Sequence, residues 1–121
     1  MRWSLDTLAL ARTIVNALED KKGEDILLLD IHEHSSFADY FVICSGTSDR
    51  MLQALADAVM DQVRKDYKEF KIRGRMEGLA ENGWVLVDLG DVILHLFSPE
   101  RREYYQLEEL WSQGKILLRL Q

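Results

Sequence analysis

The stretch "WVLVDLGDVILHLF", residues 84–97, decides how this chain folds, because two apolar runs flank a two-residue turn. Gly90 and Asp91 suit a primed β-turn, since glycine accepts the positive φ that such a turn requires. In the resulting hairpin, Trp84 faces Phe97 at the open end. Two paired strands, and therefore a β-sheet, are predicted at the centre of the fold.

The predicted hairpin has two faces of different composition, because successive side chains in a strand point to opposite sides. The aliphatic face is expected to lie in the core: Val85, Val87, Leu89, Val92, Leu94 and Leu96. The mixed face carries two aromatic rings, two aliphatic side chains, an acid and an imidazole: Trp84, Leu86, Asp88, Ile93, His95 and Phe97. The mixed face has three open interpretations: a protein-binding surface, a surface covered by a second helix layer, or a catalytic surface.

The other elements follow from periodicity and from capping residues. Two further strands are expected at 25–31 and 40–45, and a polar edge strand is expected at 69–74. Helices are expected from Ser4 to about residue 20, from the "GTSD" turn to about residue 67, and from Pro99 to residue 113. The fold class is therefore α/β, a single domain over residues 1–111 with a mixed sheet of about five strands flanked by helices. Residues 112–121 are expected to form a C-terminal tail.

Composition narrows the classes of function. The chain has 121 residues, a formal net charge of −6 and one cysteine, which permits no internal disulfide. No apolar run approaches the roughly 20 residues that span a bilayer, so we expect a cytoplasmic protein without a membrane partner. The acidic balance argues against non-specific nucleic-acid binding and suggests a neutral or basic partner. Residues 64–75 are the exception, with six basic and two acidic side chains. They form either a solvated surface or a contact with RNA phosphates.

Two groups of side chains could carry catalytic or metal chemistry. Asp88 and His95 would need a nucleophile from elsewhere in the fold, and Asp88 is expected opposite Ile93 rather than beside the imidazole. His32 and His34, with His95 or Cys44, lack the ligand spacing of a zinc site. We therefore expect no catalytic residue, no metal and no cofactor.

The "SGTS" segment, residues 45–48, precedes a predicted helix, where free backbone N–H groups can bind phosphate. The interpretation we favour is that Gly46 makes the turn and that Ser48 or Asp49 caps the helix. The alternative is a nucleotide-binding or nucleotidyltransferase-type enzyme that uses this loop. Enzymes of that type need a pair of acidic metal ligands, whereas the corresponding strand offers Asp88 alone.

Four motifs in order, "SSFADYFVICSGTSDR", "EG" at 77–78, "GWVLVDLGDVILHLF" and "RREYYQLEELW", resemble those of the Iojap/RsfS family, the ribosomal silencing factors. The resemblance covers about residues 22–111. It implies a nucleotidyltransferase-like fold without enzymatic activity. It also implies a factor that binds ribosomal protein L-fourteen on the large ribosomal subunit, sterically blocks association with the small subunit and so represses translation. Relatives in organelles are linked to large-subunit assembly, and bacterial members often form a homodimer when free.

The resemblance places the partner-binding residues in the hairpin and the last helix: Trp84, Leu86, Asp88, His95, Phe97, Tyr105 and Glu108. Another part of the last motif is expected to hold that helix against the sheet: Leu107, Leu110 and Trp111. A peripheral contact with ribosomal RNA is expected from the basic segment: Arg64, Lys65, Lys68, Lys71, Arg73 and Arg75. An acidic surface with an aromatic anchor complements ribosomal proteins, which are generally basic.

Overall fold

A computed structural model describes residues 5–72, 74–111 and 113–121 of the chain. The helices are α1 (Thr7–Asp20), α2 (Asp49–Asp66), α3 (Pro99–Tyr105) and α4 (Leu107–Leu110), with 3₁₀ turns η1 (Lys68–Phe70) and η2 (Ala80–Asn82). The strands are β1 (Glu24–Asp30), β2 (Tyr40–Ser45), β3 (Arg75–Glu77), β4 (Trp84–Asp88), β5 (Val92–Phe97) and β6 (Lys115–Leu120). They form one mixed sheet in the order β3-β4-β5-β2-β1-β6.

The connections between strands explain this order. The Gly90–Asp91 turn makes β4 and β5 antiparallel, with Trp84 opposite Phe97, so the predicted hairpin register is confirmed. The chain crosses through α2 between β2 and the hairpin, and β2 then pairs with β5 in parallel. The remaining strand pairs are antiparallel. A single α/β domain with a mixed sheet is therefore confirmed, and it has six strands among the described residues.

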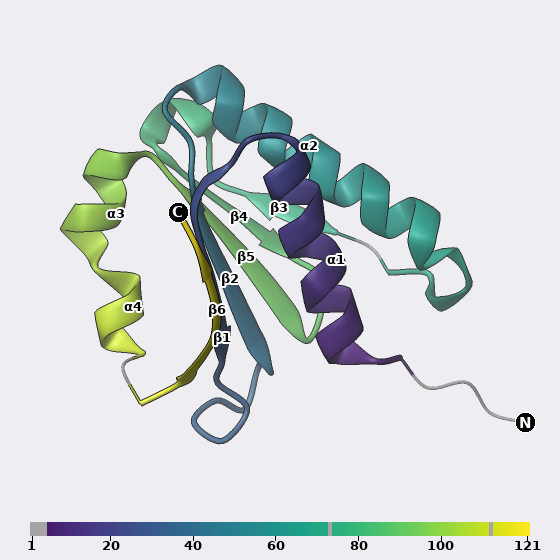
Figure 1. The fold of residues 1–121 in the computed structure, drawn as a ribbon. Coiled ribbons are helices and arrows are strands. Elements are labelled where there is room, and N and C mark those ends of the chain that lie inside the picture. Colours follow the sequence, from purple (N-terminus) through teal and green to yellow (C-terminus); the bar gives the residue numbers. More distant parts are fainter. Residues whose placement is uncertain (1–4, 73, 112) are drawn as a thin grey trace, which may run out of the picture.

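Helices cover both faces of the sheet (Figure 1). α1 and α2 lie on one face and bury the aliphatic side of the hairpin in the larger core, which confirms the prediction for that side. α3 and α4 lie on the other face, over a second, smaller core that includes Phe41, Ile43 and Phe97. Within the described residues no helix combines the length and the apolar character needed to cross a membrane.

The first helix begins later than predicted. It starts at Thr7, and the Asp6 carboxylate caps it by accepting a hydrogen bond from the Ala9 N–H at 3.1 Å. Ser4, the predicted cap, lies outside the described residues. For α2 the prediction is confirmed, because Ser48 Oγ accepts from the Met51 N–H at 3.0 Å.

The third strand was wrongly placed at 69–74. Residues 68–70 continue from α2 as a 3₁₀ turn, and Lys71 then takes a left-handed conformation with φ of 50°. A left-handed residue ends regular structure, so the chain reaches the sheet edge only at Arg75. Arg75 and Glu77 then pair with Asp88 and Leu86 of β4.

The C-terminal region also differs from the prediction. The single expected helix breaks at Gln106, whose φ of 47° separates α3 from α4. Residues 115–120, which we expected to lie in a tail, form β6 and pair with β1 along its outer edge. Their alternation was too weak to predict a strand, because three of the four central residues are consecutive aliphatic side chains.

Candidate functional site

The mixed face of the hairpin lies under and beside α3 and α4. Trp84, Leu86 and Asp88 point to this face from β4 and are half-buried. Their neighbours on β5 are far less accessible, since Phe97 is fully buried and His95 is 4% exposed. The second-helix-layer interpretation is therefore correct for the β5 side, whereas the β4 side stays partly open.

Aromatic rings connect the open part of this face to its buried part. The Trp84 ring stacks on Phe97 at 5.2 Å between centroids and contacts Tyr105 of α3 at 4.7 Å. Tyr105 is 37% exposed, and the neighbouring Tyr104 is 75% exposed. Aromatic pairs at these distances add about 0.5–1.5 kcal/mol beyond the burial of their area. The exposed aromatic edge therefore packs on the buried ring of Phe97.

The buried side chain of His95 contacts the Trp84 indole from the core side. The Trp84 Nε1–H donates a hydrogen bond to His95 Nδ1 at 3.4 Å, which assigns the imidazole proton to Nε2. His95 Nε2 is buried without a hydrogen-bond partner among the described residues. Burial lowers the pKa of His95 to about 4, so the ring is neutral at pH 7. A buried neutral ring that holds an indole in place has a positioning role.

Asp88 shapes the hairpin turn. Its Oδ1 accepts a hydrogen bond from the Gly90 N–H at 2.9 Å, and Gly90 has a φ of 89°. The Asp88 side chain lies in register with Ile93, and His95 is paired with Leu86. The two titratable groups therefore sit at different positions along the hairpin, as the register predicted.

Gly78 allows the loop before β4 to pass close to Trp84. A Cβ atom at this position would lie 2.5 Å from the Trp84 carbonyl oxygen, and the residue has a φ of 87°. A side chain cannot be accommodated at that distance from backbone. The glycine of the "EG" pair at 77–78 thus has a structural role, because it lets the backbone of this loop pass close to the backbone of Trp84.

Arg102 attaches α3 and α4 to the sheet, and its importance was missed in the sequence. Its Nη1 donates to the Asp25 carbonyl oxygen at 2.6 Å and to Ser45 Oγ at 2.8 Å, while its Nε donates to Glu108 Oε1 at 3.0 Å. The side chain is 11% exposed. Nothing in "RREYY" distinguishes Arg102 from Arg101, since the partners lie far away in the chain.

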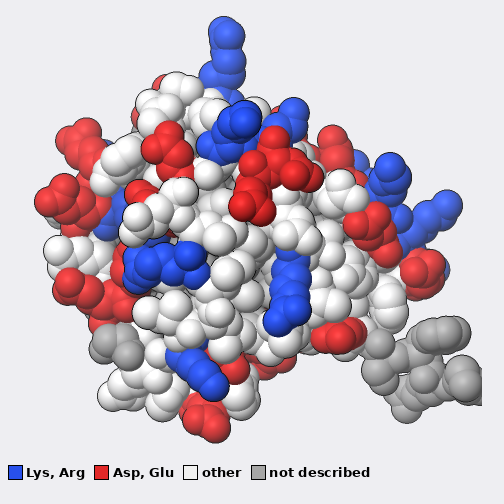
Figure 2. Space-filling view, viewed as in Figure 1, with Lys and Arg blue, Asp and Glu red and all other residues white. Residues whose placement is uncertain are grey.

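Glu108 is engaged by this arginine, so its carboxylate holds the helices together as well as facing a cavity of about 340 Å³. Leu107 and Trp111 pack against the smaller core, as predicted, and Trp111 contacts Phe41 at 5.1 Å between ring centroids. The side chain of Leu110 lies outside the described part of the chain. Figure 2 shows acidic side chains gathered over α3 and α4 at the left of the molecule.

Cys44 and His32, two candidates for nucleophilic or metal chemistry, have the following environments. Burial raises the pKa of Cys44 to about 12, so it stays a thiol. His32 Nδ1 lies 2.5 Å from Asp30 Oδ1, and this hydrogen bond raises the pKa of His32. Among the described residues, no group of three His, Cys, Asp or Glu side chains has the arrangement of a metal site.

Two of the three hydroxyl groups of the "SGTS" segment, residues 45–48, have partners within the protein. Ser48 caps α2, and Ser45 Oγ accepts from Arg102. Gly46 is packed closely, since a Cβ there would lie 2.9 Å from Leu52 Cδ2. These contacts give the segment a structural role at the junction between β2 and α2.

The basic segment lies at the end of α2 and continues to β3. Arg64, Lys65, Lys68, Lys71 and Arg75 are exposed, and Arg64 Nη1 pairs with Asp61 Oδ1 at 3.3 Å. Arg73 lies outside the described residues. Because Arg75 is in register with Asp88, the segment reaches the margin of the mixed face.

Comparisons with known proteins agree with the fold and its motifs. Residues 4–119 match the family model "Ribosomal silencing factor during starvation". The chain is 47% identical over 100 residues to "Ribosomal silencing factor RsfS" of Bacillus subtilis, covering 83% of this chain and 82% of that protein. It is 37% identical to the mouse "Mitochondrial assembly of ribosomal large subunit protein 1", covering 82% of this chain and 43% of that protein. A crystal structure from Chromobacterium violaceum matches with a TM-score of 0.80 and 35% identity, covering 89% of this chain and 88% of that one.

Proposed function

This chain belongs to the ribosomal silencing factor family, and from that premise we propose that it is an anti-association factor of the ribosome. It binds ribosomal protein L-fourteen on the large subunit, occupies the space that the small subunit needs, and thereby represses translation. The family model and the names of the relatives support a role in silencing or assembly of ribosomes. The same contact would let the protein assist large-subunit biogenesis.

The observation that carries this proposal is the partly open aromatic edge of the mixed face. Trp84, Leu86 and Tyr105 are accessible there, and Asp88 adds a carboxylate beside them. Tryptophan and tyrosine, anchored by packing underneath, are the residue types that most often dominate binding energy at protein interfaces. We assign direct contact to these four residues and to the accessible side of Glu108.

His95 and Phe97 take a different role in the proposal from the one expected. Both are buried, so they support the Trp84 ring instead of meeting the partner. Replacing either would alter binding through the position of the indole. The proposal thus has two kinds of residue: those that contact the partner, and those that hold the contacting residues in position.

Charge favours a basic partner. The chain carries a net charge of −6, and α3 and α4, which include Tyr105 of the aromatic edge, carry Glu100, Glu103, Glu108 and Glu109. Complementary charge raises the rate of association and helps to orient the partner. At the other margin, the exposed basic residues of the α2–β3 segment make a peripheral contact with ribosomal RNA.

The proposed mechanism is steric occlusion, with no covalent chemistry and no cofactor. The protein acts in the cytoplasm, and it forms a homodimer when it is not bound to the ribosome. The enzyme alternative is tested by titration with nucleotide and Mg²⁺. Saturable nucleotide binding would support the enzyme alternative, and no binding at millimolar concentration would argue against it.

A subunit-joining assay on sucrose gradients tests the proposal. The wild-type protein should co-sediment with isolated large subunits and reduce the yield of joined ribosomes. Trp84→Ala should lose both effects, because it removes the central anchor. Ile116→Ala is the matched control, since Ile116 is 53% exposed on β6 at the opposite edge of the sheet.

Two results would contradict the proposal. One is full retention of large-subunit binding by a folded Trp84→Ala protein, which would place the contact elsewhere. The other is large-subunit binding by the wild type that leaves subunit joining unchanged. Circular dichroism of both variants shows whether they are folded.

A further inference from the structure

A second surface lies at the opposite edge of the sheet from Trp84. β6 pairs with β1 along one side, and no described strand pairs with its other side. Half of the backbone N–H and C=O groups of β6 therefore face outward. Ile116 and Leu117 are adjacent on this strand and are 53% and 38% exposed. A sheet edge with neighbouring exposed aliphatic residues is a template for an added strand.

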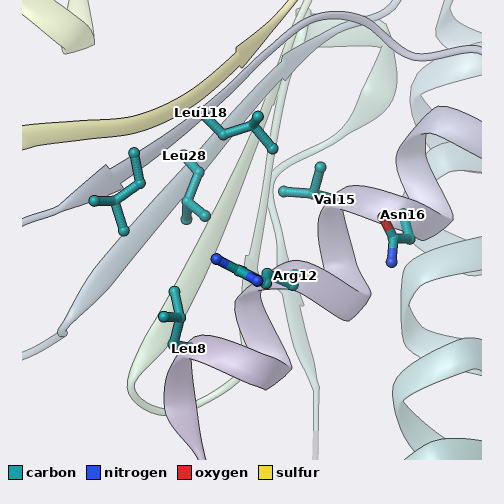
Figure 3. Close-up of a pocket in the computed structure, with 7 residues that line it drawn as sticks. Leu8, Arg12, Val15, Asn16, Leu28 and Leu118 are labelled. Atoms are coloured by element: carbon teal, nitrogen blue, oxygen red, sulfur yellow. The ribbon is translucent and has the colours of Figure 1, made fainter.

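A groove runs beside this edge, between α1 and the strands. It has a volume of about 380 Å³ and is lined by Leu8, Arg12, Val15, Asn16, Leu28, Leu117 and Leu118. Figure 3 shows Leu8, Arg12 and Val15 on α1 together with Leu28 and Leu118 on the facing strands. Most of the lining is aliphatic, so the groove suits the apolar side chains of a strand placed along β6.

The charged residues in the groove lining and on β6 are positive. Arg12 is the charged residue in the lining. Arg119 lies exposed near the end of β6, in register with Leu27 of the smaller core and therefore on the other face of the strand. Neither arginine has an ion-pair partner within the described part of the chain. Lys115, at the start of β6, lies in register with Asp30 and is partly balanced by it. The edge therefore favours an occupant with carboxylates.

The same charges disfavour a second copy of this chain. If β6 paired with β6 of another copy in antiparallel fashion about Leu117, Lys115 would face Arg119 twice. Like charges directly opposite each other destabilise a strand pair. Basic residues at a sheet edge are a known device against self-pairing.

We propose that β6 and the α1 groove form a docking site for an extended, acidic and apolar segment of another protein, which adds to the sheet as a seventh strand. Its backbone pairs with the outer edge of β6, its aliphatic side chains enter the groove, and a carboxylate meets Arg12. Three strands, β5, β2 and β1, separate β6 from β4, so this site and the Trp84 edge can be occupied together. The proposal does not depend on the proposed ribosomal function.

An end-blocked peptide in which glutamate alternates with leucine and valine is the probe. Titration into the full-length protein, followed by calorimetry and by hydrogen exchange, should show saturable binding and slower exchange of the β6 amides. Arg12→Glu combined with Arg119→Glu should weaken binding at least about tenfold, because it replaces attraction by repulsion. A peptide with lysine in place of glutamate should bind this double variant better than it binds the wild type.

A second variant covers the case in which the double variant fails to fold. Asn16→Glu adds a carboxylate to the exposed helical wall of the groove and should also weaken binding of the glutamate peptide. Absence of saturable binding up to millimolar peptide would overturn the proposal. So would a wild-type dimer, seen by sedimentation, that Leu117→Lys converts to monomer, because the occupant would then be a second copy.

Discussion

The two faces of the sheet differ in residue composition and in accessibility. The face under α1 and α2 is aliphatic and closed, and its hairpin residues, such as Leu94, are buried. The face under α3 and α4 is aromatic, contains an imidazole and an arginine with three hydrogen bonds, and stays open along β4. The comparison indicates that one face is closed and supplies stability, whereas the other leaves part of its apolar surface accessible along β4.

The attachment of the helices differs in the same way. α1 and α2 have 14 and 18 residues, and each buries an apolar stripe. α3 and α4 have seven and four residues and depend on Arg102, Leu107 and Trp111 for their contacts. Short helices held by a few specific contacts open more easily than long ones packed along a stripe. Four experiments test this contrast.

The largest effect is expected from truncation in the closed face. Leu94→Ala should lower the free energy of unfolding by about 2–5 kcal/mol, because it leaves a cavity in a fully buried core. Leu86→Ala, on the open face of the same hairpin, should cost about 1 kcal/mol or less. Urea denaturation measures both. Equal losses would mean that the two faces contribute alike to stability.

The second effect is a pH dependence that comes from His95. Its folded-state pKa of about 4 lies below the ordinary 6.5, so the unfolded chain binds the proton more readily between these values. Stability should therefore fall as the pH is lowered through this window, by about 1.4 kcal/mol per pH unit. His95→Phe should remove this component while retaining an aromatic ring.

Denaturation curves at several pH values between 4 and 7 measure the difference between wild type and His95→Phe. The other titratable groups are common to both proteins and cancel in the difference, and the lowered pKa of Asp30 keeps its titration below this range. Parallel pH profiles would show that the imidazole is not held neutral by burial.

The third effect concerns the attachment of α3. Arg102→Ala should cost about 1–3 kcal/mol, because it leaves Ser45 and Glu108 without their donor. Hydrogen exchange of the α3 amides should accelerate more than that of α1. Arg101→Ala, at the exposed neighbouring position, is the matched control and should leave α3 unchanged. Equal acceleration in both variants would reject the anchoring role.

The smallest effect distinguishes two adjacent tyrosines. Tyr105→Ala should lower stability by about 0.5–1.5 kcal/mol, because it removes the ring that packs 4.7 Å from Trp84. Tyr104→Ala should change stability by about 0.5 kcal/mol or less, since that side chain is 75% exposed. Thermal unfolding measures both. A larger loss for Tyr104 would mean that the ring packing in α3 is described incorrectly.

Several parts of the fold could be predicted because their causes are local. The Gly90 turn set the register of β4 and β5, and alternation along each strand identified the aliphatic face. The position of β3 could not be predicted, since it depends on where the chain leaves the left-handed Lys71. The strand β6 was missed because its neighbour, β1, lies almost a hundred residues earlier in the sequence.

The candidate site also has some properties that local sequence predicts and others that it does not. Its composition, with Trp84, Asp88 and His95 on one face, was readable from the period of two in the hairpin. Its accessibility was not, because burial of Phe97 and His95 depends on where α3 and α4 dock. Arg102 was missed for the same reason, since its hydrogen bonds reach residues 57 and 77 positions away.

By itself, the sequence determined the hairpin, the core face, the polarity of the other face and the family motifs, because turn chemistry and side-chain alternation act between neighbouring residues. The tertiary structure decided which aromatic rings are open, which support them, and which sheet edge remains unpaired. Those properties depend on contacts between distant segments, whose geometry no local pattern contains. The distinction between an accessible ring such as Trp84 and a buried one such as Phe97, which packs beneath it, belongs to the second group.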